Sequence, residues 1–115
     1  MADEEGLRRI GVQVADLLQR GGSATYYGTL VDARAAALGS SEGSPAAIAE
    51  EIGLVSDEAQ AFGREVEAFN EGHAKRDRAE QKLKLALDRL GILRGQLETI
   101  DKAKEKKGGR SDARN

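Results

Sequence analysis

Apolar residues recur every three or four positions along most of the chain, which is the spacing of one face of an α-helix. The strict alternation of apolar and polar residues that is typical of a strand does not occur. We predict a first helix over about residues 3–20, with Asp3 as its N-cap and Gly21 just after its end. Its apolar face consists of Leu7, Ile10, Val14, Leu17 and Leu18.

A second helix is predicted over residues 23–38, with Ser23 as the cap. Its apolar stripe consists of Tyr26, Leu30, Ala33 and Ala37, with Tyr27, Val31 and Leu38 beside it. The polar, glycine-rich residues 39–44 predict a loop.

Ser44 and Pro45 predict the start of a third helix, because Ser is a favoured cap and Pro a favoured first residue. We expect this helix to end at Gly53, and a further helix to start with Ser56 as its cap. Residues 70–72 are a predicted break. The alternative is a helix that continues through Gly72, at a cost of about 1 kcal/mol relative to alanine.

The last helix is predicted over residues 73–106 and would be about 50 Å long at 1.5 Å per residue, so part of it should project. Its apolar residues follow the 4-3-4-3 spacing of a coiled coil, and others lie outside that seam. Gly91 and Gly95 should weaken an isolated helix, so we expect a close backbone contact there. Two interpretations stay open, a core within the chain's own bundle and an interface with another subunit. The candidate interface residues are Ala79, Leu83, Leu85, Ala86, Leu87, Leu90, Ile92, Leu93, Leu97 and Ile100.

The predicted fold is therefore all-α, with four to five helices in an antiparallel hairpin or open bundle and a long C-terminal amphipathic, coiled-coil-like helix. We expect a single domain over residues 1–106 and a basic flexible tail over residues 107–115. The domain divides into an N-terminal helix pair with its loop, acidic middle helices and the long helix, at 1–43, 44–72 and 73–106.

Composition and charge add to this picture. The 115 residues include only 3% aromatics and no cysteine, so the core should be Leu, Ile, Val and Ala without disulfides. Residues 41–73 contain eight acids and one base, whereas residues 74–115 contain seven acids and thirteen bases. These two segments could pair, within one chain or between chains, or form two solvated faces.

The acidic residues after Met1 are unlike a secretory signal, and no apolar run approaches the roughly 20 residues of a membrane span. We expect an intracellular protein, cytoplasmic or within an assembled particle, that does not insert into membranes. His73 is the single histidine, and Glu50 and Glu51 point to different sides of a helix. We therefore predict no catalytic, cofactor-binding or metal-binding residues, and a protein that is not an enzyme.

The segment 48–56 resembles the first helix and turn of a helix-turn-helix DNA-binding motif, with Gly53 at the tight turn. The helix that would read DNA begins with Asp57 and Glu58, which phosphates repel, and offers only Arg64 as a base. The basic residues after Lys102 have no aromatic side chain among them to stack on bases.

These patterns predict a structural or adaptor subunit of a larger assembly, for example a phage particle, which uses helix packing for self-association or docking. The expected partners are protein subunits, either further copies or another protein. The alternative is a small helix-turn-helix-like regulator that binds nucleic acid.

Overall fold

The computed structural model describes the backbone of residues 3–113 and the side chains through residue 104. This part of the chain contains four α-helices and a short 3-10 turn, and no strand. The elements are α1 (Glu4–Arg20), α2 (Ala24–Leu38), η1 (Ser40–Glu42), α3 (Pro45–Ala68) and α4 (Ala74–Ala113). The predicted all-α fold is confirmed.

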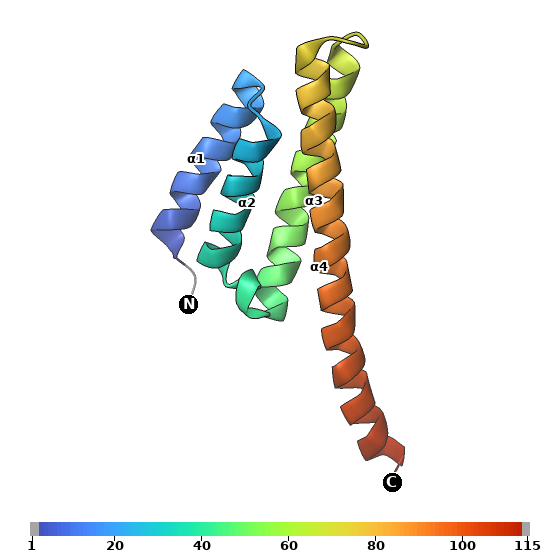
Figure 1. Cartoon of the computed structure of the whole chain (residues 1–115). Helices are drawn as coiled ribbons and strands as arrows, with labels where there is room; N and C mark the ends of the chain where they lie inside the picture. The colour runs from blue at the N-terminus through green and yellow to red at the C-terminus, as the bar shows by residue number, and fades with distance from the viewer. Residues whose placement is uncertain (1–2, 114–115) are drawn as a thin grey trace.

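Two antiparallel hairpins make up the molecule, α1 with α2 and α3 with α4 (Figure 1). The second helix lies beside α3 and α4, whereas α1 packs mainly on α2. The C-terminal part of α4 projects beyond the other helices, as its predicted length implied. The molecule measures 62 × 32 × 17 Å along its principal axes, so α4, at about 1.5 Å per residue, accounts for its longest dimension.

The predicted helix ends are confirmed at four places. The side chains of Asp3, Ser23 and Ser44 accept hydrogen bonds from the backbone N–H groups of Gly6, Tyr26 and Ala47. Each bond satisfies one of the N–H groups that a helix start leaves without a partner. Gly21 ends α1 in the left-handed conformation, with φ of 68°, where a Cβ atom would be strained.

The predicted helix end at Gly53 is wrong, because α3 runs without interruption from Pro45 to Ala68. The expected turn of a helix-turn-helix motif therefore does not exist between residues 48 and 56. Ser56 lies inside the helix rather than at its start. The predicted break over residues 70–72 is confirmed, since α3 ends at Ala68 and α4 begins at Ala74.

Two other expectations differ in detail. The buried face of α2 is one position away from the predicted stripe, with Tyr27, Val31 and Arg34 inside and Tyr26 and Ala33 exposed. The final helix continues to Ala113 instead of ending near residue 106. The flexibility expected of residues 107–115 concerns a part whose side chains lie outside the described residues, and it stays a prediction.

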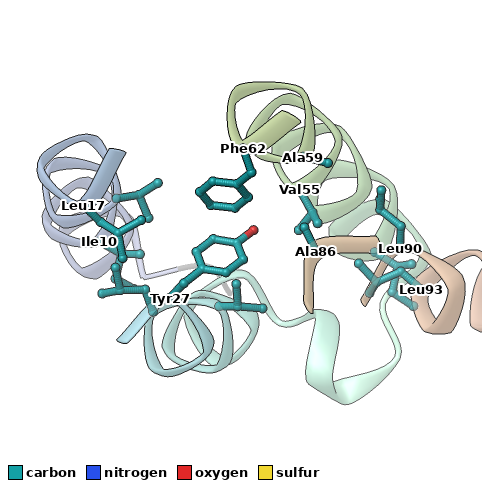
Figure 2. Close-up of a cluster of buried hydrophobic side chains, with 13 residues drawn as sticks. Ile10, Leu17, Tyr27, Val55, Ala59, Phe62, Ala86, Leu90 and Leu93 are labelled. Carbon is teal, nitrogen blue, oxygen red and sulfur yellow. The ribbon is translucent and has the colours of Figure 1, made fainter. Parts of the chain in front are cut away.

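The core lies where both hairpins meet, around two aromatic rings (Figure 2). The rings of Tyr27 and Phe62 meet edge to face, with centroids 4.7 Å apart, which is a favourable geometry for an aromatic pair. Ile10 and Leu17 of α1 approach this pair from one side. On the far side of α3, Val55 lies among Ala86, Leu90 and Leu93 of α4. The other members of this apolar cluster are Leu, Ile, Val and Ala, as the composition predicted, but the two rings at its centre were not expected there.

Candidate protein-binding surfaces

Three glutamates of α3 lie at seven-residue spacing on its inner face. Glu51 and Glu58 are buried, and Glu65 is nearly so. A buried carboxylate is costly unless a cation or hydrogen-bond donor satisfies it. We call Glu51, Glu58 and Glu65 the glutamate column. Each of its members has a basic partner on another helix.

Glu58 is the central member and binds two side chains of α2. Its carboxylate accepts hydrogen bonds of 2.5 and 2.8 Å from the Arg34 guanidinium, and one of 2.6 Å from the Tyr27 hydroxyl. Burial and the Glu58 carboxylate raise the pKa of the Tyr27 hydroxyl above its usual range. Burial alone would lower the pKa of Arg34, but the hydrogen bonds and charge of Glu58 raise it. The three groups form one hydrogen-bonded network inside the protein, in which the buried Arg34 Nε has no partner.

The outer members of the column join α3 to α4. Glu51 accepts hydrogen bonds from Ser40 and from Arg89, whose Nε lies 2.8 Å from Oε2. Glu65 forms an ion pair with the fully buried Lys82, at 2.8 Å. Two of the predicted pairings between the acidic and basic segments thus occur within one chain. These carboxylates hold helices together through buried ion pairs.

His73 lies at the start of α4, where its Nδ1 accepts a hydrogen bond of 3.1 Å from the backbone N–H of Lys75. It is exposed, as expected from its position beside a turn. Its ring lies 5.0 Å from that of Phe69. Among the described residues, no three His, Asp or Glu side chains are grouped so that they could hold a metal ion. The position of His73 therefore indicates a helix-capping role.

The ten residues that the sequence proposed as an interface fall into two groups. Eight of them are buried or half-buried within the chain's own bundle: Ala79, Leu83, Leu85, Ala86, Leu90, Leu93, Leu97 and Ile100. The other two, Leu87 and Ile92, are 54% and 55% exposed. The side chains of the first group pack inside the chain's own bundle, which is the bundle-core interpretation. Leu87 and Ile92 remain available to a partner.

A second apolar surface, which the sequence did not indicate, lies between α1 and α3. It is a groove of about 560 Å³. The α1 side includes Leu7, Gly11 and Leu18, and the α3 side includes Leu54 and Ala61. Arg34 and Glu58 also line the groove, and their charges pair with each other.

The charged residues along the α3 side of this groove change sign from one end to the other. Glu50 and Asp57 lie toward its start, and Arg64 lies toward its end. The two walls run in the same direction, because α1 and α3 both run opposite to α2 (Figure 1). Leu7 and Leu18 are separated by about 17 Å of helix, so the groove has the length of about three helical turns.

The chain matches no family model, no curated protein and no solved structure. Among the described residues, no helix is long and apolar enough to cross a membrane. The groove between α1 and α3 and the exposed side of α4, with Leu87 and Ile92, are the apolar surfaces that a partner could contact.

Proposed function

We propose that this protein is a non-enzymatic adaptor or structural subunit that binds an amphipathic helix of a partner protein. The observation that supports this best is the open apolar groove between α1 and α3. Helix α2 contacts both α1 and α3 and lies between them on the inner side of the groove. A further helix laid on the opposite side would complete a four-helix arrangement of α1, α2, α3 and the partner.

The charges of the groove favour one chemistry and one direction for that partner helix. A helix antiparallel to α1 and α3 would have the same relation to them as α2 has, and its dipole would oppose theirs. Its C-terminal half would lie near Glu50 and Asp57, and its N-terminal half near Arg64. The partner we propose therefore has an apolar stripe, basic residues in its C-terminal half and an acidic residue near its start.

Site-specific photo-crosslinking in the native source tests this proposal. Gly11 lines the groove and nothing lies within 4 Å of the position of a Cβ atom on it, so a photoreactive phenylalanine fits there. Thr29, exposed on α2 and not among the groove residues, is the matched control site. We expect position 11, and not position 29, to capture one recurring segment with the heptad spacing and charges described above.

A second variant separates binding from folding. Gly11→Trp should fill the groove and abolish co-purification of the captured protein, while helicity and the unfolding midpoint are retained. The proposal is wrong if positions 11 and 29 capture the same mixture of peptides. It is equally wrong if the folded Gly11→Trp variant still retains the partner.

A further inference from the structure

The solvent side of α4 presents a face that no other described part of the chain covers. Taking 100° per residue, the side chains of residues 80–102 that lie within about 60° of Gly91 form one stripe along the middle of this helix. The members of this stripe, the α4 outer face, are Glu80, Lys84, Leu87, Asp88, Gly91, Arg94, Gly95, Glu98 and Lys102. Every one of them is exposed. Exposed Leu87 lies within the stripe, whereas exposed Ile92 lies about 100° from Gly91 and outside it.

The charges of the α4 outer face are arranged symmetrically about Gly91 with opposite signs. Lys84 and Glu98 lie seven residues to either side of it. Glu80 and Lys102 lie eleven residues to either side. A two-fold axis through Gly91 that relates two antiparallel copies of α4 would place each base opposite an acid of the other copy. A parallel pair would instead place Lys84 beside Lys84 and Glu98 beside Glu98, which is repulsive.

The glycines in the middle of this face agree with that arrangement. The sequence led us to expect a close backbone contact at Gly91 and Gly95, but in the described part of the chain nothing outside the helix itself lies within 4 Å of a Cβ position on either residue. That expectation is wrong for the isolated chain, where no contact offsets the weakening of the helix by the two glycines. In the antiparallel pair, Leu87 of one copy would lie over the hollow that these glycines leave in the other.

We propose that two copies of this protein associate through the α4 outer face, with the two helices antiparallel and crossing at Gly91. Two ion pairs within α4 join Arg76 to Glu80 and Glu98 to Lys102. They do not prevent the association, because ion pairs near the surface contribute little to stability and the same side chains can also pair with the second copy. The face is separate from the groove between α1 and α3. A dimer would therefore present two grooves to partner helices.

Sedimentation equilibrium of the full chain, from about 1 μM to about 1 mM, measures this association. One pair of helices buries less than the usual interface of about 1,600 Å², so we expect dissociation in the micromolar range. Gly91→Leu should weaken the dimer at least about tenfold because the helices can no longer approach. The same change favours the helix itself and should raise the unfolding midpoint, which excludes misfolding as the cause. Gly53→Leu, at an exposed helical glycine of α3 with free space, is the matched control and should leave the dimer intact.

Charge reversal and cross-linking test the direction of the helices. Lys84→Glu and Glu98→Lys should each weaken the dimer, and the double variant should restore it. The chain has no native cysteine, so Lys84→Cys chains can be mixed with Glu98→Cys chains under mild oxidation. We expect the 84–98 disulfide to dominate, while the reciprocal Glu98–Lys84 pair stays intact in the same dimer.

Three results would overturn the inference: a wild-type monomer at every concentration, a dimer that Gly91→Leu leaves unchanged, or a dominant 84–84 disulfide. None of these results bears on the groove, since that proposal is tested by the capture of a different protein at position 11. The failure of one proposal is thus distinguishable from the failure of the other.

Discussion

At the scale of single residues, the two neighbouring tyrosines have opposite environments. Tyr27 is fully buried and its hydroxyl donates a hydrogen bond to Glu58, whereas Tyr26 is 41% exposed. Adjacent residues on a helix point about 100° apart, so the sequence predicts that both rings cannot share one surface. It does not predict which ring is inside, because that depends on where α3 and α1 lie.

This difference predicts an unusual alkaline titration. Burial and the charge of Glu58 raise the pKa of Tyr27, whereas an unfolded tyrosine ionises near pH 10. Above about pH 10 the unfolded chain therefore binds fewer protons than the native protein at this group. The contribution of Tyr27 to stability, complete below pH 10, should fall by about 1.4 kcal/mol per pH unit above it.

Tyrosinate absorbance checks this prediction, since the chain has no tryptophan. In the Tyr26→Phe background Tyr27 is the one remaining tyrosine, and we expect it to ionise only together with the loss of helical circular dichroism. Tyr27→Phe should remove this step. Ionisation of Tyr27 with the helices intact would contradict the hydrogen-bonded network around Glu58.

At the scale of elements, α3 shows how far the sequence pattern reaches. Ile48, Ile52, Val55, Ala59 and Phe62 keep one unbroken 4-3-4-3 spacing across Gly53, and these residues face the core or its edge. Burial of this stripe outweighs the cost of an exposed helical glycine, about 1 kcal/mol. The unbroken phase of this stripe predicts one continuous helix, and it is a stronger signal here than the single glycine.

The glutamate column could not have been identified so readily. Charged residues in a helix are usually solvated, and residue spacing along α3 does not reveal which helices lie opposite. Glu51, Glu58 and Glu65 become explicable only when Arg34, Lys82 and Arg89 are placed beside them by α2 and α4. The caps of α1, α2 and α3 were predictable for the opposite reason, since a cap depends on neighbours in sequence.

The column predicts a non-additive response to mutation. Arg34→Met should leave the Glu58 carboxylate buried without its cation and cost about 3–5 kcal/mol. Replacing all three partners, with Tyr27→Phe, Arg34→Met and Glu58→Met, removes every buried polar group of the network. The triple variant should therefore recover most of the lost stability.

Urea unfolding followed by circular dichroism measures these changes. Arg64→Met is a suitable control, because Arg64 is an exposed base on α3 that also lines the groove, and it should change stability by less than about 1 kcal/mol. If the triple variant is less stable than Arg34→Met alone, the carboxylate is not the source of the cost.

At the scale of the whole molecule, the two helices of the α3–α4 hairpin are packed together more extensively than those of the α1–α2 hairpin. The contact between α3 and α4 is the most extensive in the protein, and two ion pairs of the glutamate column reinforce it. Helix α1 has only one buried face, which packs on α2 and the edge of the aromatic pair, and its other side borders the groove. A partner helix in the groove would therefore bind against the least supported element.

This difference predicts that α1 opens before the rest of the protein unfolds. Amide hydrogen exchange should show lower opening free energies for α1 than for α3 and the first half of α4, because fewer buried contacts must be lost. Leu17, 2% exposed, is the anchor of α1, and Leu17→Ala should cost α1 about 3 kcal/mol. That variant should lose protection in α1 while α3 and α4 keep theirs.

Val12→Ala is the control, at a position that is 67% exposed on the same helix. It should leave amide protection unchanged in α1 and in the other helices. Equal loss of protection in all four helices of Leu17→Ala would mean that the protein unfolds as one unit.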